Sequence, residues 1–189
     1  MTGIANWNEA VGTDTPSLKR VAADGQRVSD LCDLLEAMAD DLPKVAPAVW
    51  KEARRLSLTL LPEHLDDMAQ VLLPVLARRA GSDLTCAQML ARLQLDYEDG
   101  SLHLTELSDM LADGAVSGGR AMSSDALGYA LRGFFEPLRR QMDWEKDVLL
   151  PLATRCLTAD DLTEIARRMG NPSRRARTPI PNVRGSGRA

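Results

Sequence analysis

Two residues, His64 and Glu145, carry side chains that can bind a metal ion or transfer a proton, and both fall on helical faces that are otherwise apolar. A carboxylate facing an apolar core is costly to bury unless it is paired. A single histidine on such a face is most often a hydrogen-bonded core residue. The sequence contains no nucleophile triad, phosphate-binding loop or catalytic carboxylate pair with a matching base. We therefore expect a protein that is not an enzyme.

These two residues lie in the two copies of an internal repeat. Residues 64–74 read HLDDMAQVLLP and residues 141–151 read QMDWEKDVLLP. The copies share Val-Leu-Leu-Pro and the Asp at the third position, so we expect two related helices placed by a pseudo-twofold relation. The first and fifth positions of each copy are one helical turn apart and point the same way. They hold His64 and Met68 in the first copy, and Gln141 and Glu145 in the second.

Four long segments have the apolar spacing of amphipathic helices, and short connections join them. They cover roughly residues 17–41, 48–80, 84–113 and 125–156. This pattern predicts an all-α fold, an up-down-up-down four-helix bundle. Pro62, Pro74 and Pro137 are expected to bend or interrupt their helices. Thr158 to Asp161 has the form of a capping box, which predicts a short fifth helix that ends near Met169.

The chain resembles the hemerythrin-like (HHE cation-binding) family over residues 17–169. The likeness rests on the repeated Leu-Leu-Pro, on LCDLLEAMADDLP at 31–43 and on LGYALRGFFEPLRR at 127–140. It implies a four-helix bundle in which a His on the first helix, a His-x-x-x-Glu pair on the second, a His on the third and another such pair on the fourth bind two irons. The matching positions in this sequence hold Gly25, His64 and Met68, Tyr97, and Gln141 and Glu145.

Among these positions only His64 and Glu145 keep a residue of the implied ligand type. Glycine and methionine offer no hard oxygen or imidazole, glutamine is a poor iron ligand, and tyrosine coordinates only as a phenolate, from a reference pKa of about 10. A transition-metal site usually needs three or four good protein ligands. We therefore expect a hemerythrin-like protein with a degenerate metal site and no cofactor, acting as a binding or regulatory module for a protein partner.

Two other functions stay open at this point. The first is a genuine iron-binding protein, with a di-iron or mononuclear site, that senses oxygen, iron or redox state. It would use the reduced ligand set of His64, Glu145, Tyr97 and Asp67. The second is an enzyme acting in the vacated pocket, for which the sequence supplies no nucleophile or base pair.

The preferred structural hypothesis is a polar cluster of His64, Glu145, Gln141 and Tyr97 in the place of the metal. A protonated His64 would then replace the lost cation beside Glu145. The alternative is that the fourth helix is rotated and Glu145 reaches solvent. His103 and the Asp66–Asp67 pair are expected on the solvated surface.

Composition sets the broad class. The chain has 189 residues, 44% hydrophobic and only 4% aromatic, which predicts one domain with an aliphatic core. It has no apolar stretch that could span a membrane and no signal peptide, so we expect a cytoplasmic protein. Cys32, Cys86 and Cys156 are expected to be small core residues in a reducing compartment.

The ends of the chain are expected to lie outside the bundle. Residues 1–16 are predicted to be a flexible N-terminus, and residues 170–189 a disordered Arg-rich tail. The tail could dock on an anionic partner. Because the tail lacks interleaved aromatics, nucleic-acid binding is expected to be weak at most.

Overall fold

The structure is a computed structural model that describes residues 15–81, 84–115 and 123–170. All regular elements within these ranges are helical, which confirms the all-α prediction. Most of the predicted tail, most of the predicted N-terminal segment and most of the connection before residue 124 lie outside the described residues. Among the described helices, none combines the length and the apolar character that crossing a membrane requires.

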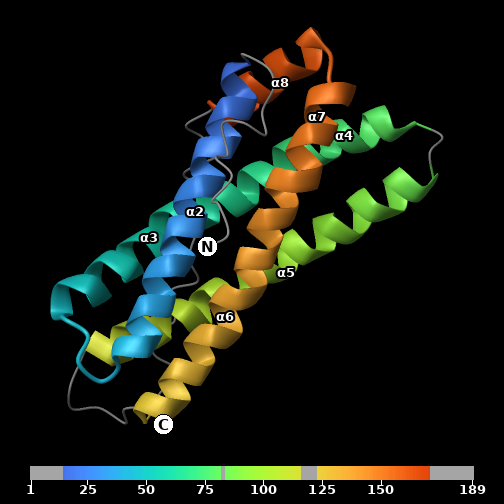
Figure 1. Ribbon diagram of the computed structural model, residues 1–189. Helices are drawn as coiled ribbons and strands as arrows, with labels where there is room; N and C mark the ends of the chain where they lie inside the picture. The colour runs from blue at the N-terminus through green and yellow to red at the C-terminus, as the bar shows by residue number, and fades with distance from the viewer. Residues whose placement is uncertain (1–14, 82–83, 116–122, 171–189) are drawn as a thin grey trace, which may run out of the picture.

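The helices follow the predicted order with ends shifted by one or two residues. They are α2 (Pro16–Asp41), α3 (Pro47–Asp67), η1 (Met68–Leu72), α4 (Leu73–Ala80), α5 (Leu84–Ala115), α6 (Ser124–Trp144), η2 (Glu145–Leu149), α7 (Leu150–Cys156) and α8 (Ala159–Met169). The segments α3, η1 and α4 follow one another without a break and form one long helix, and α6, η2 and α7 form another (Figure 1).

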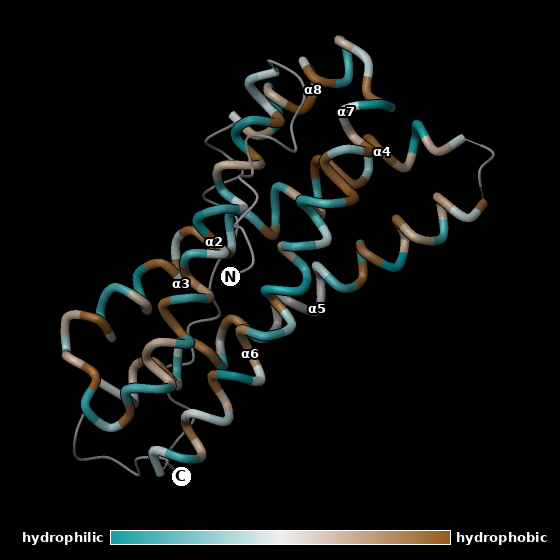
Figure 2. The backbone as a smooth tube through the Cα atoms, in the orientation of Figure 1, coloured by the Kyte–Doolittle hydropathy of each residue, from teal (hydrophilic) through white to brown (hydrophobic). Residues whose placement is uncertain are grey.

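The long helices pack around a mostly aliphatic core. Helix α2 packs against α3 and α6, and α3 packs against α5, whereas α5 and α6 make few contacts with each other. Hydrophobic residues recur along each helix at the spacing of an amphipathic face (Figure 2). The largest fully buried side chains are Tyr97 and Phe135, and leucines make up most of the rest.

The two repeat copies contain π-helical turns at the same register, directly before Pro74 and Pro151. A proline lacks the backbone N–H and its ring clashes with the carbonyl four residues earlier. Widening the helix by one residue relieves this conflict, so the N–H of Leu73 donates to the carbonyl of Met68, and that of Leu150 to Glu145. Pro74 therefore alters its helix as predicted.

The other two prolines do not interrupt their helices. Pro62 lies inside α3 and Pro137 inside α6, and both helices continue through them.

The carbonyl of Gln70, four residues before Pro74, accepts a hydrogen bond from Arg168 Nη2 at 2.6 Å. An arginine of α8 thus satisfies an acceptor that the proline cannot.

Helix α8 begins with the predicted capping box. The Thr158 hydroxyl accepts from the N–H of Asp161 at 3.3 Å, and the Asp161 carboxylate accepts from the N–H of Thr158 at 2.9 Å. Asp161 also accepts hydrogen bonds from Arg79 Nε at 2.6 Å and Nη2 at 3.0 Å. The hydrogen bonds from Arg79, followed by those from Thr158, hold the pKa of Asp161 well below its ordinary value.

Replacing Asp161 with alanine should lower the free energy of unfolding by about 2 kcal/mol at neutral pH, because both the cap and the charged hydrogen bonds are lost. The depressed pKa means that this stability is present above the ordinary carboxylate pKa of about 3.9 and is lost as the pH falls. Urea unfolding at neutral and acidic pH measures both effects. Asp160→Ala, at the exposed neighbouring residue, is the control. An equal loss in both variants would contradict the assignment.

Two predictions about burial need correction. Cys156 is exposed and Cys86 is half-buried, so only Cys32 is the core residue expected of all three. Asp66 and Asp67 are half-buried and not on a fully solvated face. The reason for Asp67 is that Arg20 reaches across from α2 and contacts its carboxylate at 3.3 Å. His103 is exposed, as predicted.

Candidate functional site

Three helical segments bring His64, Tyr97 and Glu145 together in the core. His64 lies in the last turns of α3, Tyr97 in α5, and Glu145 is the first residue of the π turn η2. Their exposed fractions are 3%, 1% and 0%. Residues far apart in the sequence therefore form one buried polar cluster, which we call the Glu145 cluster.

Glu145 is the centre of this cluster. His64 Nε2 lies 3.0 Å from one carboxylate oxygen and 3.3 Å from the other. The Tyr97 hydroxyl donates a short hydrogen bond to Oε1 of the same carboxylate. Glu145 thus faces the core and is satisfied there, so the alternative in which a rotated helix exposes it is wrong.

The charges of the cluster favour an ion pair. Burial alone would lower the pKa of His64, but the charge of Glu145 and its hydrogen bond, with the charges of Asp24 and Asp67, raise it above the ordinary value. His64 therefore favours the protonated form, in which Nε2 donates to Glu145. This direction agrees with the expectation of a protonated His64 beside Glu145.

Tyr97 stays a phenol in this environment. Burial raises its pKa well above 10, and the Glu145 charge and hydrogen bond add to the rise. The amide of Gln141 opposes the rise. A phenol in this state donates its proton to the carboxylate and is poorly suited to act as a phenolate ligand.

The residues at the remaining resemblance positions do not complete a ligand set. Met68 is fully buried and Gly25 is buried within α2. Gln141 lies one turn before Glu145 and is half-buried, and its Nε2 atom is buried without a well-formed hydrogen bond to any residue that the structure describes. Sequence reasoning thus placed His64, Tyr97 and Glu145 correctly in one cluster, with Gln141 at its edge.

Arg20 is a residue of this region that the sequence prediction missed. It contacts Asp24 at 3.6 Å and Asp67 at 3.3 Å, and it also donates to the carbonyl of Met169. Arg20 therefore neutralises two of the carboxylates that act on His64. The spacing of Arg20 and Asp24, one turn apart, could have predicted their ion pair. No pattern in the sequence indicated the hydrogen bond from Arg20 to Met169 of α8.

The donor set does not fit a di-iron centre. Both oxygens of Glu145 face protein groups, and Met68 and Gly25 supply no hard donor. Within the described ranges, no three His, Cys, Asp or Glu side chains gather closely enough to hold a metal ion. Comparison with protein-family models, curated proteins and solved structures finds no match for this chain.

Replacing Tyr97 with phenylalanine should lower the free energy of unfolding by about 1.5–3 kcal/mol, because Glu145 loses a donor in a dry core. Urea unfolding measures the loss. Tyr129→Phe is the matched control, since Tyr129 is 81% exposed and its change should stay within about 0.5 kcal/mol. Equal stabilities for the two variants would show that the Tyr97 hydroxyl contributes nothing to the cluster.

Proposed function

We propose that this chain is a hemerythrin-like up-down-up-down bundle that has lost its di-iron centre and acts as a non-enzymatic binding or regulatory module. The observation that carries the proposal is the buried contact between His64 and Glu145, at 3.0 Å. These residues stand at the first position of one repeat copy and the fifth position of the other. An imidazolium between the helices takes the place that the family resemblance gives to metal.

Two further observations support this proposal. The π turns start at Met68 and Glu145, the matching positions of the two copies, so the two copies share the same local backbone conformation although their side chains differ. Tyr97, at the position of the third helix's ligand, donates to Glu145 and so helps to satisfy the carboxylate without a metal ion.

One observation favours the rival function of iron binding with a reduced ligand set. His64, Tyr97 and Glu145 converge, and each type of side chain can coordinate iron. Asp67, the fourth member of that set, instead contacts Arg20 from α2. A metal would have to displace the proton of Tyr97 and the imidazolium proton of His64 before it could bind.

Elemental analysis of the purified full chain, produced with added iron, separates the two functions. We expect iron far below one atom per chain, and no change in iron content on His64→Ala. Stoichiometric iron that disappears in His64→Ala would overturn the proposal in favour of the rival.

A second experiment asks which part of the chain binds a protein partner. Affinity capture with and without residues 170–189 should show whether the bundle or the Arg-rich tail carries the interaction. Capture that survives removal of the tail assigns the protein partner to the bundle.

A further inference from the structure

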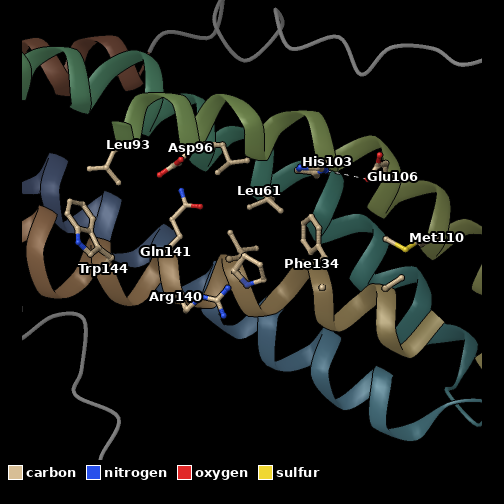
Figure 3. A pocket seen from close by; sticks show the side chains of 15 residues that line it. Leu61, Leu93, Asp96, His103, Glu106, Met110, Phe134, Arg140, Gln141 and Trp144 are labelled. Carbon is tan, nitrogen blue, oxygen red and sulfur yellow. Dashed lines mark hydrogen bonds and ion pairs between the residues drawn. The ribbon is translucent and has the colours of Figure 1, made fainter. Parts of the chain in front are cut away.

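A long groove lies between α5 and α6, where these helices make few contacts with each other. It has a volume of about 1010 Å³, at the upper end for a small-molecule site. Leu61 and Leu65 of α3 form part of its apolar lining, and it extends from Trp144 past Phe134 to Met110 (Figure 3). The lining residues of α6 span Ala130 to Trp144, roughly 21 Å along the helix.

The acidic residues of this groove have salt-bridge partners, whereas its arginine has none among the described residues. Its two acids are already paired on α5, since Asp96 contacts Arg92 at 3.2 Å and Glu106 contacts His103 at 3.3 Å. Arg140 of α6, by contrast, forms no salt bridge with any residue in the described ranges. The groove therefore has cationic character on its α6 side, and no carboxylate among the described residues forms a salt bridge with it.

Gln141, the next residue of α6, adds a second polar group to the lining of the groove. Figure 3 shows its side chain extending from α6 into the gap toward α5. Its amide nitrogen is buried and makes no well-formed hydrogen bond with a described residue. An amide nitrogen has two N–H donors, so at least one is free for an acceptor even though the group lies near Tyr97. A guanidinium and an amide without acceptors suit a carboxylate.

We propose that this groove binds a single-chain amphipathic carboxylate of the fatty-acid class. Its hydrocarbon chain lies along the leucines and aromatic rings, and its carboxylate contacts Arg140, with Gln141 as a polar neighbour in the lining. This inference does not rest on the proposed function, because His64, Tyr97 and Glu145 do not line the groove. It assigns a ligand site that stands whether or not the bundle holds metal.

Gly133 offers a way to block the groove without disturbing the fold. It lines the groove, is exposed, and a Cβ added there would meet no atom within 4 Å. A larger side chain at this position therefore projects into open space. Replacing a glycine inside a helix also removes a conformational cost, so such variants should fold.

Isothermal titration calorimetry with dodecanoate, below its micellar concentration, tests the proposal on the full chain. We expect saturable binding of one dodecanoate per chain. Arg140→Glu should weaken it at least about tenfold, and Gly133→Trp should abolish it. Gly133→Ala, the control that removes the glycine but barely narrows the groove, should retain the affinity within about threefold. Circular dichroism melts confirm that each variant is folded.

Three results would overturn the proposal. The first is the absence of saturable dodecanoate binding to the folded wild-type chain. The second is equal affinity for dodecyltrimethylammonium, which has the same tail and the opposite charge. The third is a wild-type dimer in sedimentation experiments that Gly133→Trp dissociates, since the groove would then be covered by a second copy.

Discussion

His64→Ala should lower the free energy of unfolding by about 3–5 kcal/mol. The reason is that Glu145 is fully buried and would lose its only cationic neighbour in the Glu145 cluster. The loss exceeds the stability that an imidazole contributes by packing alone. The reason is that a carboxylate in the core without a counter-ion must either keep an unfavourable charge or take up a proton. Urea unfolding at pH about 6 measures it, where the ion pair is intact.

Two variants separate the charge from the packing. Glu145→Gln keeps the shape and removes the charge, and its amide can accept from Tyr97 and donate to a neutral His64, so its loss should be clearly smaller than that of His64→Ala. The triple variant His64→Leu, Glu145→Leu, Tyr97→Phe replaces the cluster with apolar groups and should recover most of the stability. If His64→Ala costs no more than Glu145→Gln, the ion pair does not hold the cluster together.

The stability of the wild-type protein should fall as the pH rises above the ordinary histidine pKa. The folded protein holds the proton of His64 more tightly than the unfolded chain, because its pKa is raised by Glu145 against the opposing effect of burial. The contribution is therefore fully present below a pH of about 6.5 and is lost as the pH rises through the folded pKa. Its slope can reach about 1.4 kcal/mol per pH unit.

Urea unfolding across the range from about pH 5 to about pH 9 measures this slope, with Glu145→Gln as the reference. The variant should be much flatter, since it lacks the charge that raises the pKa of His64. Arg20, Asp24 and Asp67, the other charged groups facing His64 from α2 and α3, are unchanged in both proteins. Equal pH profiles would show that His64 is neutral in the fold.

Tyr97 should make the stability fall further as the pH becomes alkaline. Its raised pKa means that unfolding is favoured once the unfolded chain ionises, above a pH of about 10. With Tyr129→Phe, Tyr97 becomes the only tyrosine of the chain, which contains two. Tyrosinate absorbance should then appear only together with unfolding. Tyrosinate absorbance that appears in the folded protein near the ordinary pKa of tyrosine would contradict the buried hydrogen bond from Tyr97 to Glu145.

Local patterns in the sequence were sufficient for the elements and for part of the site. The apolar spacing of the long segments gave helix ends within a residue or two, and Thr158 and Asp161 form the predicted capping box. The repeat placed His64 and Glu145 at related positions on two helices. These features are local, since helical periodicity, capping and register depend on residues within a few turns of one another.

Several features of the backbone, the surface and the helix packing were not predicted. The π turns before Pro74 and Pro151, the contact of Arg20 with Asp67, and the exposure of Cys156 were not predicted. The groove also depends on how far α5 lies from α6, which neither helix encodes alone.

The sequence by itself determined that this protein is helical, where its long helices run, and that one histidine and one glutamate interrupt their apolar faces. Only the tertiary structure decided that these two side chains meet, that Tyr97 joins them, and that α5 and α6 leave a groove beside Gln141. The physical reason is that a helical pattern fixes the direction of a side chain relative to its own axis. The partner of that side chain depends on how all the helices pack to bury their apolar faces together.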